Sequence, residues 1–326
     1  MKLDSFRLER YFAKHEFAAP YLLCSSDCES MAIGDLLALE PGAPERFSSL
    51  WLGYTESLGG QELRAAIAAL YERTSADQVL VHAGAEEAIF NFMNVVLNPG
   101  DHVIVQAPYY QSLGEVALGI GAEVSEWQGN PEREWELDLE DLKAALSRRT
   151  KVVVVNFPHN PTGYLPTREF IRELSELSEQ NDFIIFSDEV YRGLELDPAE
   201  RLPAFADVND RAVSLGVMSK AYGLAGLRIG WIATQNGDLF DELAAFKDYT
   251  TICNSAPSEF LAALALQNSE TIVERNLQII RNNLDLLDLF FDAYRDLIDW
   301  YRPKAGSIAF PRLLQGSVDA FCTDLR

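Results

Sequence analysis

Residues 151–163 read KVVVVNFPHNPTG, and residues 183–191 read FIIFSDEVY. Each stretch is an uninterrupted apolar run, VVVV at 152–155 and FIIF at 183–186, followed at once by polar side chains. A strand that shows one face to water alternates apolar and polar residues, whereas a continuous run indicates a strand covered on both faces. The two stretches therefore predict a mainly parallel sheet with helices on both of its faces.

Similar β-rich runs, separated by helical runs, extend from these stretches in both directions. The predicted strands are Val79–His82, His102–Gln106, Glu123–Trp127, Val152–Asn156, Phe183–Ser187, Ala212–Met218 and Gly230–Ala233. Apolar residues at helical spacing predict helices at 62–71, 86–97, 110–119, 139–147 and 167–179. The alternation predicts an α/β fold with a mainly parallel, seven-stranded sheet sandwiched by helices.

The two ends of the chain lack this alternation. After Pro257 the strand pattern fades, a long helical run covers about 269–295, and KAGSIAFPRL (304–313) predicts a single strand. Residues 1–50 are expected to be irregular. We therefore predict a large domain at 46–268 and a smaller α+β lobe made of 1–45 and 269–326, with that lobe incomplete at its C-terminal end.

The composition restricts the class of partner. Fifty acidic residues against 27 basic ones give a net charge of −23, which disfavours nucleic acid and anionic membranes as partners. The charged N-terminus has no apolar stretch of the kind found in signal peptides, and four cysteines in a long chain are typical of reduced thiols, so a cytoplasmic location is expected. Cys24 and Cys28 have no second pair or nearby histidine, so no metal site is predicted.

Polar and aromatic side chains follow five of the predicted strands. In open α/β sheets, ligands bind at the carboxyl ends of the strands, so these side chains are expected to meet at one edge. The segments concerned are Ala83–Glu86, Ala107–Tyr110, Phe157–Gly163, Asp188–Tyr191 and Ser219–Lys220. This convergence predicts the binding site.

Three charged residues carry most of the expected chemistry. Lys220 follows an apolar strand, and burial there favours the neutral amine, which can attack an aldehyde. Asp188 ends a buried strand and could keep a pyridine nitrogen protonated, although an Asp after a strand is often only a helix cap. Arg228 lies between apolar neighbours and needs an anion, either a phosphate or a structural carboxylate.

For several uncharged residues, the sequence supports a binding role less strongly. Gly84 and Ala85 open a helix after a strand, where backbone N–H groups can approach a phosphate. Tyr109 could stack on an aromatic ligand. Tyr191 could donate a hydrogen bond to a phenolate oxygen, although simple packing is the more common role of such a tyrosine. Asn160 stands before a proline, a common turn sequence.

Together these segments resemble one family, the class I/II aminotransferases among the fold type I pyridoxal-phosphate enzymes. The resemblance spans roughly residues 30 to 310, and NFPHNPTG and SKAYGLAGLRIGW also resemble the capreomycidine synthase-like cyclases of this group. Each motif alone is weak, but their order is specific. The matching segments are YTESLGGQELR (54–64), AGAEEAI (83–89), NFPHNPTG (156–163), SDEVY (187–191) and SKAYGLAGLRIGW (219–231).

The resemblance implies pyridoxal 5′-phosphate as cofactor, amino acids and 2-oxo acids as substrates, and a homodimer. Lys220 resembles the Schiff-base lysine and proton carrier, Asp188 the partner of the ring nitrogen, and Tyr109 the stacking aromatic residue. Asn160 and Tyr191 resemble the donors to the phenolic oxygen. The remaining implied residues are Gly84, Ala85, Glu86, Ser219 and Arg228 at the phosphate, Tyr54 at the phosphate of the neighbouring subunit, and Gly34, with Asn160, near the substrate.

The motifs hold a cofactor but do not decide which bond is broken. A β-lyase, cyclase or racemase is therefore an alternative to transamination. A cofactor-binding regulator is disfavoured because it would need a DNA-binding module, of which the sequence shows no sign. A nucleotide-dependent dehydrogenase is disfavoured because the sequence lacks the glycine-rich fingerprint. In this family an arginine binds the substrate carboxylate. That arginine is expected beyond Arg326 and is not equated with Arg312. The sequence does not identify which amino acid is the substrate.

Overall fold

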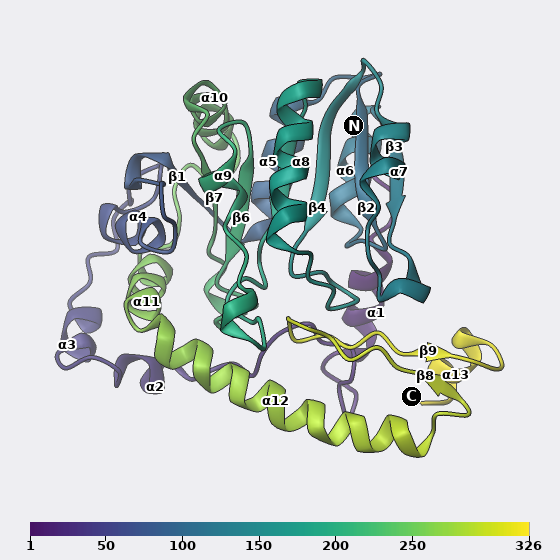
Figure 1. The fold of residues 1–326 in the computed structure, drawn as a ribbon. Coiled ribbons are helices and arrows are strands. Elements are labelled where there is room, and N and C mark those ends of the chain that lie inside the picture. Colours follow the sequence, from purple (N-terminus) through teal and green to yellow (C-terminus); the bar gives the residue numbers. More distant parts are fainter. Residues whose placement is uncertain (326) are drawn as a thin grey trace.

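The computed structural model describes residues 1–325 and contains a seven-stranded sheet between two layers of helices (Figure 1). The strand order is β1-β7-β6-β5-β4-β2-β3; β7 is antiparallel to both neighbours, and all the other pairs are parallel. Each predicted strand is confirmed to within two residues at its ends. The bounds are β1 Val79–His82, β2 His102–Ala107, β3 Glu123–Gln128, β4 Thr150–Asn156, β5 Ile184–Asp188, β6 Val213–Val217 and β7 Gly230–Thr234.

The apolar run of β4 is buried on both faces, as its continuity predicts. Val152 and Val154 belong to one hydrophobic core, whereas Val153 and Val155 belong to the other. The first core lies under α5 (Ala85–Val96), α6 (Ser112–Ile120) and α10 (Gly237–Lys247), and the second lies under α7 (Leu139–Ala145), α8 (Arg168–Asn181) and α9 (Phe205–Val208). The predicted α/β sandwich is therefore confirmed.

Caps define the ends of several of these helices. The Thr167 hydroxyl accepts a hydrogen bond from the N–H of Phe170 at the start of α8, and Asn236 does the same for Leu239 at the start of α10. α10 and α11 (Ala256–Gln267) were not predicted, because their apolar residues are spread around the helix rather than gathered on one face.

The N-terminal region is more regular than predicted. It contains α1 (Arg7–His15), α2 (Ile33–Leu37) and α3 (Ala43–Ser48), and α4 (Gln61–Ala68) follows. In Figure 1, α1 lies below β4 and β2, near the carboxyl ends of the parallel strands. This position brings the first helix of the chain to the edge where the site was predicted.

The predicted long helix is confirmed as α12 (Ser269–Ala293), but the strand expected at 304–313 is reduced to two residues. β8 (Ile298–Asp299) pairs with β9 (Arg312–Leu313), and α13 (Val318–Asp324) follows. Pro303 and Pro311 flank the segment, and Gly306 adopts φ +85°, so the chain between them cannot continue a ladder. The division into 46–268 and a lobe of 1–45 with 269–326 stays a prediction.

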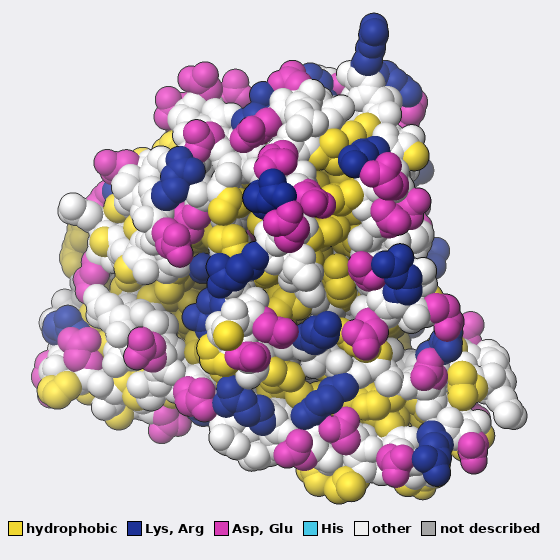
Figure 2. Space-filling model, viewed as in Figure 1, with side chains coloured by type: hydrophobic (Ala, Val, Ile, Leu, Met, Phe, Trp, Pro, Cys, Tyr) yellow, Lys and Arg dark blue, Asp and Glu magenta, His cyan; other side chains and the backbone are white. Residues whose placement is uncertain are grey.

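α12 runs along the carboxyl edge of the sheet and is attached to the loop after β6 (Figure 1). The Asn276 side chain on this helix is fully buried and donates a hydrogen bond of 2.9 Å to the carbonyl oxygen of Ala221. No helix within residues 1–325 combines the length and the apolar character needed to cross a membrane. On the face shown in Figure 2, acidic and basic side chains are interspersed.

Candidate active site

A cavity of about 340 Å³ opens at the carboxyl ends of the central parallel strands. Asn156 ends β4, Asp188 ends β5, Lys220 lies just after β6, and Ala85 begins α5 after β1. Eight of the predicted site residues line this cavity together, so the expected convergence at one sheet edge is confirmed. They are Ala85, Glu86, Asn160, Asp188, Tyr191, Ser219, Lys220 and Arg228.

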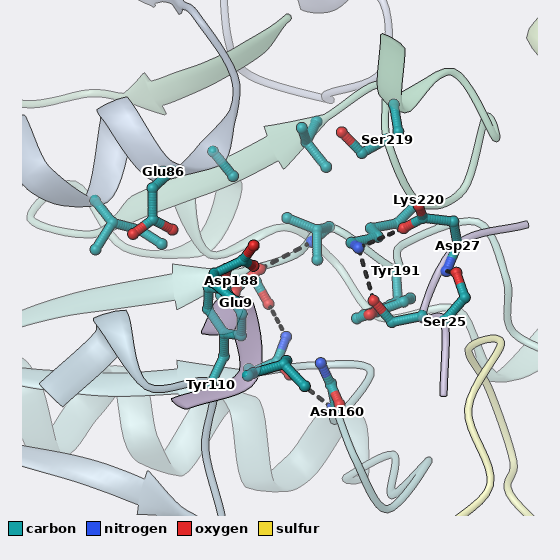
Figure 3. Close-up of a pocket in the computed structure, with 18 of the residues that line it drawn as sticks. Glu9, Ser25, Asp27, Glu86, Tyr110, Asn160, Asp188, Tyr191, Ser219 and Lys220 are labelled. Carbon is teal, nitrogen blue, oxygen red and sulfur yellow. Dashed lines mark hydrogen bonds and ion pairs between the residues drawn. The ribbon is translucent and has the colours of Figure 1, made fainter. Parts of the chain in front are cut away.

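Asp188 is the most deeply buried acid of the cavity. In Figure 3 it lies between Glu86 on one side and Lys220 on the other. Its carboxylate accepts a hydrogen bond of 3.2 Å from the backbone N–H of Val190, while the Asn156 side chain donates to its backbone oxygen at 2.8 Å. Burial raises the pKa of Asp188 to about 7, and Lys220 opposes that rise. A cationic group of a ligand beside this carboxylate would stabilise its charged form.

Lys220 is held by two residues from the N-terminal segment. Its ammonium group donates hydrogen bonds of 2.6 Å to Asp27 and 2.7 Å to the Ser26 hydroxyl (Figure 3). About a quarter of the side chain is exposed. Lys220 therefore lines the cavity with its amine held by the N-terminal segment.

A second group of residues forms an anion site at the start of α5. A Cβ at Gly84 would lie 2.6 Å from the Arg228 guanidinium, and a Cβ at Gly230 would lie 2.8 Å from the backbone nitrogen of Ala85. Glycine at both positions thus lets the guanidinium and the free N–H groups of a helix N-terminus face the same space. The Glu86 carboxylate, which also lines the cavity, accepts a hydrogen bond of 3.1 Å from the Ser112 hydroxyl. Such a set of donors suits a phosphate.

The Tyr191 hydroxyl is a further polar group that faces the cavity. It is buried and has no hydrogen-bond partner of normal geometry within residues 1–325. Burial raises the pKa of Tyr191, and the nearby Ser26 hydroxyl offsets only part of that rise. Asn160 lines the cavity beside it, with its backbone N–H bonded to the Asn156 side chain at 2.7 Å. A buried donor without a partner fits a ligand oxygen here, as pyridoxal phosphate would supply.

Four predicted residues are not among those that line the cavity: Gly84, which borders the anion site, and Tyr109, Gly34 and Tyr54. The Tyr109 ring packs against Gly114 of α6, and Tyr110 lines the cavity instead. The side chains of adjacent residues in a turn point in different directions. The ring that faces the cavity is therefore that of the next residue, Tyr110. Gly34 lies in α2, with open space beside it, and Ser25 to Asp27 line the cavity in its place. Tyr54 is 86% exposed and does not reach this chain's own cavity.

Several other residues that line the cavity could not be predicted from the sequence pattern. Asn156 is hidden in the last position of a strand, and the polar run Ser25–Asp27 lies in an irregular segment. α1 contributes one face because positions 8, 12 and 16 are four residues apart. Within residues 1–325, no three His, Cys, Asp or Glu side chains are grouped so as to hold a metal ion. The cavity residues without a prediction include Leu8, Glu9, Phe12, Glu16, Ser25, Ser26, Asp27, Tyr110 and Asn156.

Gly84→Ala is expected to weaken cofactor binding by about tenfold, because alanine is strained at φ +89° and its methyl group would displace the Arg228 guanidinium. Equilibrium dialysis of the cofactor measures the dissociation constant. Gly237→Ala, at the start of α10 with open space around it, is the matched control and should bind as the unchanged protein does. Equal dissociation constants for the two variants would contradict the anion site.

Comparison with known proteins agrees with this geometry. The family model described as aminotransferase class I and II matches residues 38–326. Capreomycidine synthase of Streptomyces vinaceus is 34% identical over 94% of this chain and 78% of its own length. Aspartate/prephenate aminotransferase of Thermus thermophilus is 31% identical over 72% of this chain, which spans 62% of that relative's length.

A solved structure matches over a larger share of both chains. The crystal structure of a PLP-dependent aminotransferase from Streptococcus suis matches with a TM-score of 0.93 and 32% identity, over 99% of this chain and 87% of that one. The predicted fold and the predicted family are thereby confirmed, and both support pyridoxal phosphate as the cofactor. The chain therefore belongs to the family of class I and II aminotransferases.

Proposed function

We propose that this protein is a pyridoxal-phosphate-dependent aminotransferase that moves an amino group from an amino acid to a 2-oxo acid. One observation carries the proposal. A reactive amine (Lys220), a buried carboxylate (Asp188) and an unpartnered phenol (Tyr191) face a single cavity whose far end is an anion site. An aldehyde cofactor with a pyridine nitrogen, a phenolic oxygen and a phosphate is complementary to all four features.

Each residue then has a role toward the cofactor or the substrate. When bound, pyridoxal phosphate draws electrons from the substrate's α-carbon, which makes a proton there removable. Lys220 holds the cofactor covalently and moves that proton, while Asp188 keeps the ring nitrogen protonated. Asn160 and Tyr191 donate hydrogen bonds to the phenolic oxygen. Tyr110 takes the stacking position that the sequence suggested for Tyr109.

The phosphate end of the cofactor is bound by the anion site. Arg228 supplies a planar pair of donors, Ser219 a hydroxyl group, and Ala85 and Glu86 supply backbone N–H groups. Gly84 leaves room for the guanidinium. These residues would hold the phosphate of the cofactor at the end of the cavity that Ala85 and Arg228 line.

Product analysis tests the reaction class. A transaminase incubated with an amino acid alone should form one equivalent of 2-oxo acid per site and then stop. Turnover should resume only when a 2-oxo acid acceptor is added. Continued product formation without any acceptor would contradict transamination.

A second candidate is another reaction on the same cofactor, that of a cyclase, β-lyase or racemase. The similarity to capreomycidine synthase over 94% of the chain favours the cyclase among these. The cavity residues bind the cofactor in either case, so the acceptor requirement separates the two proposals.

We also propose a homodimer, in which Tyr54 reaches the phosphate of the neighbouring subunit. Tyr54 and Trp51 lie in an exposed segment joined to the segment of Tyr249 by the hydrogen bond from the Thr55 hydroxyl to the Asn254 carbonyl oxygen. Tyr249 is 91% exposed. Large aromatic side chains so exposed on neighbouring segments are typical of a surface that is covered in an assembly.

Light scattering should give a molar mass of twice the 36.4 kDa of the chain. Trp51→Ser with Tyr249→Ser should shift the protein toward monomer and weaken cofactor binding, because Tyr54 then lacks a partner. Leu289→Ser, at another largely exposed apolar residue, on α12, should leave the mass unchanged. A monomer with full cofactor affinity would contradict the dimer proposal.

The proposed location is the cytoplasm. All four cysteines (Cys24, Cys28, Cys253 and Cys322) are free thiols, and burial raises the pKa of Cys28 to about 11. Unpaired thiols are typical of reducing compartments.

A further inference from the structure

We propose that the cavity selects an amino acid whose side chain carries a positive charge at the end of an apolar stem. This inference rests on the proposed function, because it concerns the substrate of the same site. It is carried by the charges that remain at the cavity once the cofactor-binding residues are assigned.

The α1 helix and the residue that follows it present acids to the cavity and bases to solvent. Glu9 and Glu16 line the cavity together with Leu8 and Phe12. The basic residues of the same helix, Arg7, Arg10 and Lys14, are exposed and do not line it. In Figure 3, Glu9 projects from the purple ribbon of α1 toward the centre of the site. The helix therefore makes the cavity wall negative although its own composition is not acidic.

Among the described residues, no salt bridge pairs either of these two acids with a cation. Glu9 and Glu16 form no salt bridge within residues 1–325. The basic residues that line the cavity are Lys220 and Arg228, and both are assigned to the cofactor. A bound cation would therefore meet uncompensated carboxylates, whereas a second carboxylate on a substrate side chain would be repelled.

Asp27 adds a third negative charge at the reacting end. In the cofactor-free protein it is paired with the Lys220 ammonium group at 2.6 Å. Once Lys220 is committed to the cofactor, this pairing is weakened or lost, and a partly buried carboxylate gains from a new cationic partner. The substrate is the molecule that enters this space.

The remaining lining indicates the shape of that cation. Leu8 and Phe12 offer apolar surface to methylene groups, and Glu9 and Glu16 lie before and after Phe12 in the chain. The absence of any three-membered metal-binding group within residues 1–325 disfavours a metal ion as the charge that these acids take up. An ammonium or guanidinium group on a flexible apolar stem fits both features.

Spectral titration of the cofactor-loaded enzyme tests the inference. L-Lysine, L-ornithine and L-arginine are compared with L-norleucine, a neutral analogue of similar length, and with L-glutamate. The cationic amino acids should bind about tenfold more tightly than norleucine, and glutamate more weakly than both. Equal dissociation constants for lysine and norleucine would overturn the inference but leave the proposed function standing. A cofactor band that no amino acid changes would instead count against the proposed function.

Variants of the acidic wall localise the effect. Glu9→Gln with Glu16→Gln should lower the preference for lysine over norleucine to within about threefold, and Glu16→Lys should move the preference toward glutamate. Glu45→Gln, an exposed acid on α3 outside the cavity, is the matched control and should keep the preference of the unchanged enzyme. An unaltered preference in both wall variants would overturn the assignment of these two residues.

Discussion

Replacing Lys220 with alanine is expected to lower turnover by about 10⁴-fold or more, because the change removes both the covalent attachment of the cofactor and the group that carries the proton. The protein should remain folded. About a quarter of the Lys220 side chain is exposed, and its ion pair with Asp27 is of a kind that contributes about 1 kcal/mol or less. The anion site should still bind the cofactor without a covalent bond. Steady-state kinetics and circular dichroism measure the two effects.

Lys143→Ala is the matched control for this variant. Lys143 forms an ion pair of 2.7 Å with Glu140 on α7, outside the cavity, so its loss removes a lysine and an ion pair without touching the site. Its activity should equal that of the unchanged enzyme. A Lys220→Ala variant that keeps more than a tenth of the activity would refute the assignment of Lys220.

Replacing Asp188 with asparagine is expected to lower turnover by several orders of magnitude. Asparagine has nearly the same shape and can keep the contact with Val190, but it has no charge to hold a proton on the ring nitrogen. The cofactor would then withdraw electrons less well, and the α-proton would leave more slowly. Near-normal kinetics in Asp188→Asn would exclude this role.

The same substitution should stabilise the cofactor-free protein, and more so at high pH. The pKa of Asp188 rises on folding from its ordinary value of 3.8 to about 7, because the charged form is buried. The folded protein therefore holds this proton after the unfolded chain has lost it, so unfolding becomes easier as the pH rises from about 4 to 7. Asparagine removes this penalty. We expect its advantage in the free energy of unfolding to grow by about 2.5 kcal/mol between pH 5 and pH 8.

Urea unfolding of the cofactor-free proteins at the two pH values measures this difference. Asp241→Asn, an exposed residue on α10, is the control, and its effect should not change with pH. If Asp188→Asn is no more stabilising at pH 8 than at pH 5, Asp188 is not the buried titrating group described here. Loss of activity together with a gain in stability is the expected sign of a residue kept for function rather than for folding.

The sheet could be predicted from the sequence because its information is local. Runs such as VVVV at 152–155 have no polar residue to face water, so burial on both sides was the sole arrangement open to them. The strand ends then brought Asp188, Asn160 and Lys220 to one edge. Their convergence follows from the parallel direction of β4, β5 and β6 and requires no knowledge of distant contacts.

The errors arose where position depends on packing across the chain. Tyr109 and Tyr110 are equivalent in sequence, and the contact of Tyr109 with Gly114 decides which ring faces the cavity. Asp27 meets Lys220 across 193 residues, a proximity that no local pattern encodes. α1 is a short helix, and its sequence does not show which element it packs against. The position of its acidic residues at the cavity could therefore not be predicted from the sequence.

The central claim is that Lys220 holds the cofactor, and borohydride reduction followed by peptide mapping tests it most directly. The protein loaded with pyridoxal phosphate should be yellow, should lose its visible band on reduction, and should carry the cofactor on the peptide that contains SKAYGLAGLR (219–228). Attachment to another lysine, or a protein that stays colourless with added cofactor, would contradict the assignment of Lys220 and of the cavity around it.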